Sequence, residues 1–251
     1  DASKAFDRVD HCRLFDKLRD RGVPACFIDV LVEWYGKLSA IVRWHNCFSS
    51  SFDIKAGVRQ GGVLSPIFFN VYMDDLISQL SVCGYGCHIN RRFLGCIMYA
   101  DDILLISASV NGLQKLLDTC FLYCVDVGLS LNAKKSNCVS IGGCGKMKIS
   151  NMTIGMQEIE WSSSLKYLGV LFDVGKHLKV NCSEIRRKFY AAFNAVLYKC
   201  KHFNESLQLY LIQVYCLPLL MYCMNVLMVN QNDLREISVC WNDAFRRIYG
   251  L

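Results

Sequence analysis

Residues 93–107 read FLGCIMYADDILLIS, two apolar runs that enclose the acidic pair Asp101 and Asp102. Short apolar runs joined by a polar tip predict a buried β-hairpin whose turn carries both carboxylates. Acidic groups beside a core are costly unless they are paired or bind a metal ion, which favours a functional role. An ordinary turn is the alternative, because Asp is common in turns.

A second phrase, VYMDDLI at residues 71–77, also places two aspartates after a tyrosine. It lies in the helix predicted after Ser65, a suitable N-cap, and Pro66, a suitable first helical residue. Successive helical residues point about 100° apart, so Asp74 and Asp75 diverge. We therefore expect this pair on a solvated helix face and take the hairpin pair as the chemical candidate.

The remaining pattern mixes helices and strands and becomes helical from residue 181. Apolar spacing and end signals predict helices over 11–21, 24–36, 66–80 and 110–127. Alternation and β-formers predict a hairpin within 39–55, single strands over 137–142 and near 152–160, and a strand pair over 165–172. The side chains expected to face the core are Leu14, Phe15 and Leu18; Phe27, Ile28, Leu31, Val32 and Tyr35; Ile67, Phe68, Val71, Leu76 and Leu80; and Leu113, Leu116, Leu117, Cys120, Phe121, Cys124 and Val125.

Composition indicates a globular chain, with 53% hydrophobic and 20% charged residues among 251. The cysteine count of 15 is odd and residues 1–10 are polar, unlike a signal peptide. We expect reduced, mostly buried thiols in an intracellular, reducing compartment. A zinc site from Cys83, Cys87, His88 and Cys96 is the alternative, although its spacing fits no firm pattern.

The net charge of +6 is uneven along the chain. Residues 1–175 hold 18 Lys and Arg against 17 Asp and Glu, whereas residues 176–251 hold 10 against 5. A basic C-terminal part suits a polyanionic partner. The apolar stretch 207–229 is long enough to span a membrane, but its polar residues and central Pro218 favour a buried, kinked helix.

Metal-assisted phosphoryl transfer needs carboxylates from separate segments around two cations about 3.5–4 Å apart. Asp1, with Phe6 five residues later, is a candidate for the second segment. Five phrases then occur in the order seen in the reverse transcriptases of non-LTR (LINE-type) retrotransposons, which this chain resembles. They are DASKAFDRVDH, GVRQGGVLSP, MYADDILL, GLSLNAKKS and LKYLGVLF, and LPLLMY at 217–222 is similar to the family's thumb.

The resemblance implies an α+β fold, with a palm of antiparallel sheet and packed helices over 1–175 and a helical thumb over 176–251. It implies two Mg²⁺ ions, with Mn²⁺ as a possible substitute, held by Asp1, Asp101 and Asp102. Lys135 would protonate or steady the leaving pyrophosphate, although two adjacent lysines are also an ordinary solvated turn.

The same resemblance implies contacts to an incoming dNTP. Phe6 would pack under the deoxyribose and exclude a 2′-hydroxyl, unless it is only a core residue. Gln60 would lie beside the nucleotide and template base, and Gly61 would allow close backbone approach. Arg59 would meet phosphate or pair with a carboxylate. Asp7 and Asp10 are interpreted as capping or surface groups.

An RNA template and a DNA primer are the implied macromolecular partners, without a membrane. Tyr99 adjoins the catalytic pair, and the turn of a primer-grip hairpin would support the primer end. The basic thumb helices would follow the duplex backbone without reading its sequence. The implied primer and template contacts are Tyr99, Lys166, Tyr167, Leu168, Gly169, Lys188, Lys199 and Lys201.

The family also places a fingers subdomain before the first motif. Because these residues begin at that motif, we expect an incomplete fragment in which the palm strand carrying Asp1 is cut short. We expect residues 1–251 alone to polymerise weakly or not at all. Alternatives are a group II intron-type reverse transcriptase, a non-catalytic copy that binds RNA–DNA hybrids, and a zinc or redox module built on the cysteines. The family implies a nuclear or cytoplasmic location.

Overall fold

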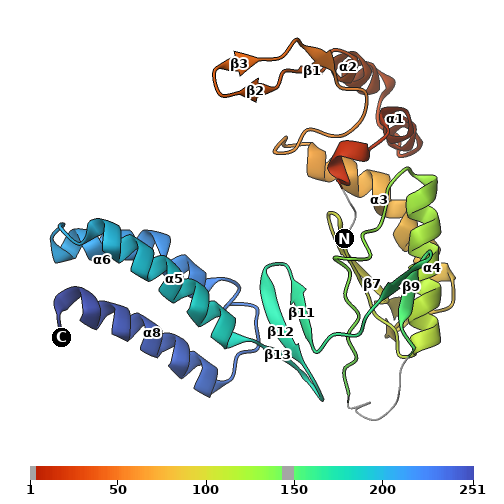
Figure 1. The fold of residues 1–251 in the computed structure, drawn as a ribbon. Coiled ribbons are helices and arrows are strands. Elements are labelled where there is room, and N and C mark those ends of the chain that lie inside the picture. Colours follow the sequence, from red (N-terminus) through yellow and green to blue (C-terminus); the bar gives the residue numbers. More distant parts are fainter. Residues whose placement is uncertain (1–3, 143–149) are drawn as a thin grey trace. The chain divides into compact units, whose positions relative to one another are not determined.

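The computed structural model describes residues 4–142 and 150–251, so Asp1 lies outside the described residues. These residues form two compact units (Figure 1). The first contains 4–137 and 150–160, and the second contains 138–142 and 161–251. The strands over 164–180 belong to the same compact unit as the helices that follow them. The functional boundary between palm and thumb at residue 175 stays a prediction.

Helices of the first unit begin and end near the predicted residues. They are α1 (His11–Asp20), α2 (Ala25–Gly36), α3 (Ser65–Val82) and α4 (Val110–Asp126). Asp10 caps α1 by accepting a hydrogen bond from the Arg13 backbone N–H, which confirms its predicted capping role. Ser109 caps α4 by the same kind of contact with Gly112.

The predicted core faces are only partly correct. Phe27, Val32, Ile67 and Val125 were expected in the core, but each is exposed. Ile28 of α2 and Phe68 and Leu76 of α3 are buried as predicted. Apolar spacing shows which residues share a helix face, but the width of the buried face depends on the elements that pack against it.

Short antiparallel strand pairs accompany these helices. The predicted hairpin within 39–55 is confirmed, with β1 (Ser39–Ala40) paired to β4 (Phe52–Asp53) and β2 (Arg43–Trp44) paired to β3 (Cys47–Phe48). The other pairs are β5 (His88–Ile89) with β6 (Arg92–Phe93), β7 (Cys96–Tyr99) with β8 (Asp102–Leu105), and β9 (Met152–Ile154) with β10 (Gln157–Ile159). The expected mix of helices and antiparallel strands is therefore observed, as separate small sheets.

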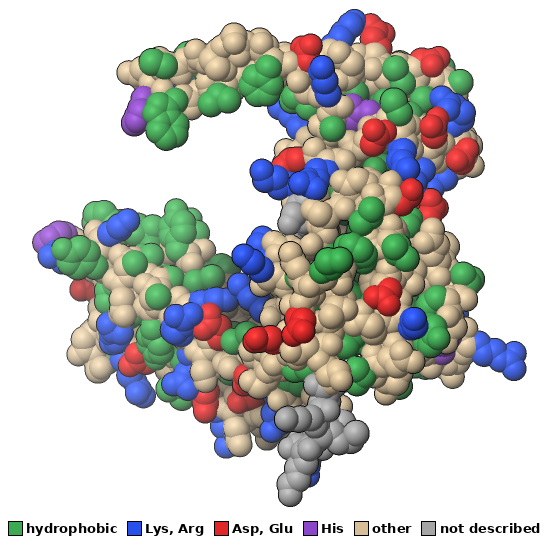
Figure 2. Space-filling model, turned by 45° about the vertical axis from the view of Figure 1, so that its right-hand side comes forward, with side chains coloured by type: hydrophobic (Ala, Val, Ile, Leu, Met, Phe, Trp, Pro, Cys, Tyr) green, Lys and Arg blue, Asp and Glu red, His purple; other side chains and the backbone are tan. Residues whose placement is uncertain are grey.

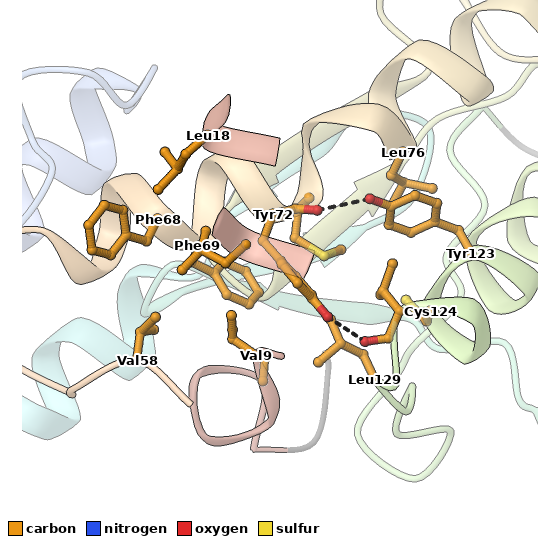
Figure 3. Packing of buried hydrophobic residues seen from close by; sticks show 14 of the residues in the cluster. Val9, Leu18, Val58, Phe68, Phe69, Tyr72, Leu76, Tyr123, Cys124 and Leu129 are labelled. Carbon is orange, nitrogen blue, oxygen red and sulfur yellow. Dashed lines mark hydrogen bonds between the residues drawn. The ribbon is translucent and has the colours of Figure 1, made fainter. Parts of the chain in front are cut away.

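Tyr72 of α3 is at the centre of the first unit's core (Figure 3). Its ring is fully buried, and its hydroxyl donates to the Val127 carbonyl at 2.7 Å. The Tyr123 hydroxyl of α4 donates to the Tyr72 carbonyl at 2.9 Å. Lys17 of α1 also donates to that carbonyl and to the Tyr123 hydroxyl. These bonds join α1, α3 and α4, and they satisfy polar groups that would otherwise be costly to bury.

The second unit consists of a three-stranded sheet and a group of helices. The sheet has the order β11 (Ser164–Tyr167), β12 (Val170–Val174), β13 (Leu178–Val180), with both pairs antiparallel. The helices are α5 (Cys182–Cys200), α6 (Glu205–Tyr215), α7 (Leu217–Met221) and α8 (Gln231–Tyr249). Phe189, Phe193 and Ile212 are completely buried in their shared core.

Two predictions fail in this unit. No strand spans 137–142 in the described residues; a single bridge joins Cys138 to Trp161, and Gly142 turns the chain at φ 110°. The helix expected to bend at Pro218 instead breaks at Cys216, which separates α6 from α7. Proline lacks an N–H and its ring clashes with the preceding turn, so it begins a new helix more readily than it continues one.

Within the described ranges no helix is both long and apolar enough to cross a membrane. The described cysteines are all free thiols. Cys120, Cys124 and others are buried as expected, whereas Cys12, Cys26 and Cys47 are exposed.

Candidate active site

The hairpin β7–β8 presents the acidic pair at its tip. Tyr99 pairs with Asp102, so Ala100 and Asp101 form a two-residue loop. Ala100 has a φ of 53°, in the left-handed region that costs an L-residue about 1 kcal/mol. Such strained residues are found at functional sites more often than elsewhere.

The hairpin is buried on one face only, which corrects the prediction of two buried strands. Met98 and Ile103 are cross-strand partners that pack on the core. Tyr99 and Asp102 are also partners, and because side chains alternate along a strand they occupy the opposite face. Tyr99 is 65% exposed and Asp102 is half-buried. The second carboxylate therefore lies on the accessible face of the hairpin.

Neither the Asp101 nor the Asp102 side chain forms a hydrogen bond or an ion pair with any residue in 4–142 or 150–251. Two adjacent half-buried carboxylates without a cationic partner offer oxygen ligands of the kind that Mg²⁺ prefers. The described residues contain no group of three or more His, Cys, Asp or Glu arranged to hold a metal ion. The predicted third ligand, Asp1, lies outside the described residues.

The other acidic pair is neutralised by basic side chains. Asp74 and Asp75 are exposed on α3, which confirms the predicted solvated face. Asp74 pairs with Arg21 at 2.5 Å, and Asp75 pairs with Lys17. These contacts bind α1 to α3, so this copy of the phrase has a structural explanation.

Phe6 packs against the core helix α3. Its ring stacks on Phe69 with the centroids 4.8 Å apart and an interplanar angle of 12°. Phe6 is nevertheless only half-buried. A half-buried ring held flat against a fully buried one is compatible both with core packing and with an accessible edge, so its predicted contact with the sugar stays a prediction.

The segment after Phe6 runs beside the glycine-rich segment 57–62. The Val58 N–H donates to the Phe6 carbonyl at 2.7 Å, and the Gly57 N–H donates to the Val9 carbonyl at 2.8 Å. A Cβ on Gly57 would lie 2.8 Å from the Asp7 Cα. Only glycine permits this backbone approach, so two motifs that are about 50 residues apart in sequence are adjacent in the fold.

Gln60 Nε2 donates to Asp7 Oδ1 at 3.1 Å. Both residues line a cleft of about 650 Å³ whose other walls come from residues 38–40, 54 and 56–59. Asp7 was interpreted as a capping or surface group; it is exposed, but it contacts a predicted nucleotide-binding residue. The position of Asp7 directly after Phe6, a predicted nucleotide-binding residue, was the feature of the sequence that could have indicated this contact.

The residues around Gln60 also differ in detail from expectation. Ser65 does not cap α3; its hydroxyl donates to the Arg59 carbonyl at 2.5 Å and so closes the loop instead. Gly61 has a φ of 79°, which suits glycine. Arg59 is exposed and pairs with no carboxylate in the described part of the chain, so one of its two predicted alternatives is not observed.

Lys135 lies in a turn organised by Asn132. The Asn132 side chain accepts hydrogen bonds from the backbone N–H groups of Lys134 and Lys135 at 3.1 and 3.3 Å. Both lysines are exposed. Asn is well suited to such turns because its side chain bonds to the backbone two residues on. The Asn132 bonds fix the backbone of the turn, and the role of Lys135 at pyrophosphate stays a prediction.

The predicted primer-grip residues form the β11–β12 hairpin of the second unit. Tyr167 pairs with Val170, so Leu168 and Gly169 are the turn. The Tyr222 hydroxyl donates to the Leu168 carbonyl at 2.9 Å. Tyr222 is 54 residues from Leu168 in the sequence, so no local pattern predicted this contact.

The predicted thumb lysines are partly engaged within the second unit. Lys188 lies 3.9 Å from Glu184, and Lys201 lies over the ring of Tyr198 at 5.3 Å. Lys199 is exposed in the last turn of α5. Figure 2 shows Lys and Arg side chains mixed with Asp and Glu on the visible face of this unit. On that face, the basic side chains are therefore interspersed with acidic ones.

A family model described as "Reverse transcriptase (RNA-dependent DNA polymerase)" matches residues 1–172. The chain belongs to the reverse transcriptases. The Pol polyprotein of the retrotransposable element R2DM from Drosophila melanogaster is 33% identical over 73% of this chain. A probable RNA-directed DNA polymerase from transposon BS of the same species is 32% identical over 71%, and that of mobile element jockey from Drosophila funebris is 28% identical over 75%.

These relatives confirm the resemblance to reverse transcriptases of non-LTR retrotransposons. The matched segment is 18% of the R2DM protein, 20% of the transposon BS protein and 21% of the jockey protein. This reverse transcriptase chain thus spans about a fifth of the length of these relatives. What the full-length relatives do comes to this chain only as a proposal.

Proposed function

We propose that this chain is the catalytic part of an RNA-directed DNA polymerase of a non-LTR retroelement. It would join dNTPs to the 3′-hydroxyl of a DNA primer on an RNA template. The observation that carries the proposal is the acidic pair at the β7–β8 tip, accessible and without a cationic partner among the described residues. The ion-paired Asp74 and Asp75 offer no comparable ligands.

Asp101 and Asp102, with Asp1, would hold two Mg²⁺ ions. Bound divalent cations lower the pKa of the primer hydroxyl and stabilise charge on the reacting phosphate and on pyrophosphate. Lys135 would donate a proton or positive charge to the leaving group. Free carboxylates on a strained turn support this metal assignment, since aspartates already paired with cations are poor ligands.

The remaining residues would bind and orient the substrates. Phe6 would select deoxyribose, while Gln60, Gly61 and Arg59 would contact the nucleotide at the edge of the 650 Å³ cleft. Tyr99 and the β11–β12 turn would support the primer. Residues 1–175 would form the palm and 176–251 the thumb, with Lys166, Lys188, Lys199 and Lys201 along the RNA–DNA backbone.

Primer extension tests the proposal. Residues 1–251 are assayed with Mg²⁺ on a primed RNA template, both alone and joined to the region that precedes the matched segment in a relative. We expect activity from the joined protein and little from the chain alone. Asp101→Asn should abolish incorporation, whereas the matched variant Asp74→Asn should retain most of it. Equal loss in both variants would show that the metal assignment is wrong, and binding without extension by the joined protein would favour a non-catalytic copy.

A further inference from the structure

The tip of the β11–β12 hairpin is held by a tyrosine from a distant segment. Tyr222 Oη donates to the Leu168 carbonyl at 2.9 Å. The ring lies against the other turn residue, since a Cβ on Gly169 would be 3.5 Å from Tyr222 Cε1. One side chain therefore contacts both central residues of the turn.

This turn needs support, because both central residues have positive φ, 47° at Leu168 and 81° at Gly169. Two-residue hairpin turns of this kind favour Asn or Gly, whereas leucine pays a steric penalty in the left-handed region. A hydrogen bond to the Leu168 carbonyl favours the one peptide orientation in which that carbonyl faces Tyr222. The Tyr222 hydroxyl thus offsets the conformational cost of the leucine.

The helix that precedes Tyr222 is packed in the core of the second unit. Tyr222 directly follows α7, where Leu220 is 1% exposed and packs in the helical core together with Cys216. Tyr222 itself is 53% exposed. A half-exposed side chain adds little to the core, and its hydrogen bond to the Leu168 carbonyl acts on the conformation of the hairpin tip.

We infer that Tyr222 is a positioning residue, which holds the Leu168–Gly169 turn in the conformation that meets the primer 3′ end. The inference rests on the proposed function, in which this turn is the primer grip. It adds a residue from outside the hairpin and predicts that loss of a single hydroxyl weakens recognition of the primer end without weakening attachment to the duplex.

Fluorescence anisotropy can measure this difference. The 251-residue chain is titrated with an RNA–DNA hybrid that has a recessed primer 3′ end and, separately, with a blunt hybrid of equal length. For Tyr222→Phe we expect the preference for the recessed end to fall about threefold to tenfold, the range for one hydrogen bond. Affinity for the blunt hybrid should not change. Tyr210→Phe, which removes a hydroxyl from a 60% exposed tyrosine on α6, should change neither value.

A rescue variant and hydrogen exchange complete the test. Adding Leu168→Gly to Tyr222→Phe should return amide exchange in the turn toward its wild-type rate, because glycine adopts positive φ without penalty. Primer preference is not the readout for this double variant, since Leu168 is itself a predicted primer contact. Exchange at the Gly169 and Val170 amides should be faster in Tyr222→Phe. Unchanged preference and exchange in that variant overturn the inference. If the wild-type chain binds neither hybrid while exchange responds to the substitution, the hydroxyl supports the turn but the proposed function fails, and the primer role fails with it.

Discussion

The carboxylate of Asp7 accepts a hydrogen bond from the Gln60 side chain at 3.1 Å, across about 50 residues of sequence. The first motif of the chain is thereby connected to the glycine-rich second motif at the rim of a cleft. The backbone N–H groups of Gly57 and Val58 also donate hydrogen bonds to carbonyls of the first motif. The predicted nucleotide-binding loop is therefore oriented by residues that directly follow Phe6.

Asp7→Ala should impair nucleotide binding more than the chemical step. Loss of the hydrogen bond frees the Gln60 amide, and an exposed bond of this type contributes about 1 kcal/mol, so KM for dNTP should rise about fivefold with little change in kcat. Steady-state incorporation by the joined protein measures both constants. Asp20→Ala, at an exposed aspartate at the end of α1, is the control and should change neither. A fall in kcat alone would contradict this interpretation of Asp7.

Gly57→Ala should destabilise the first unit by roughly 2–4 kcal/mol. The new Cβ would lie 2.8 Å from the Asp7 Cα and 2.9 Å from its carbonyl atoms, and the φ of 95° disfavours alanine. Urea denaturation followed by circular dichroism gives the free energy of unfolding. Gly36→Ala, where an added Cβ meets nothing within 4 Å, should be neutral or slightly stabilising. Similar stabilities for the two variants would mean that the close approach at Gly57 is relaxed in solution.

Replacement of Phe6 by valine should relax sugar selection. A smaller side chain leaves room for a 2′-hydroxyl, so the ratio of kcat/KM for dNTP to that for rNTP should fall on the order of tenfold. Single-nucleotide incorporation with each substrate gives this ratio. Because Phe6 stacks on Phe69, circular dichroism must first confirm that the variant is folded. An unchanged ratio in a folded variant would assign Phe6 to the core alone.

Stability should fall as pH rises above about 9, because burial raises the pKa of the Cys96 and Cys124 thiols to about 11. A raised pKa in the folded state means that the unfolded chain loses these protons first. Folding is therefore favoured fully below pH 9 and progressively less up to pH 11. Urea denaturation in reductant at pH 8 and pH 10.5 measures the loss. Cys124→Ala should reduce this loss of stability between pH 8 and pH 10.5, whereas substitution of the exposed Cys12 by serine should not. Equal losses of stability in the two variants would count against this explanation.

Local signals in the sequence predicted the well-defined elements correctly. Apolar spacing and end signals predicted the bounds of α1 and α4 closely, and the two apolar runs predicted the β7–β8 hairpin. Predictions failed where a partner element decides the outcome. Ser65 bonds to the Arg59 loop instead of capping α3, and Phe27 is exposed because no described element covers it. The candidate carboxylates were found from sequence, but the Asp7–Gln60 and Tyr222–Leu168 contacts were not.

The sequence by itself determined the family and predicted which acidic pair is the catalytic candidate, because motif order and the contrast between a hairpin tip and a helix are local, linear properties. The tertiary structure decided which residues support the site. Asp74 and Asp75 are paired with α1, Gly57 lies against Asp7, and Tyr222 contacts Leu168. Each of these contacts joins residues about 50 or more positions apart, and their pairing depends on how the packed elements bring backbones together, which no short stretch of sequence encodes.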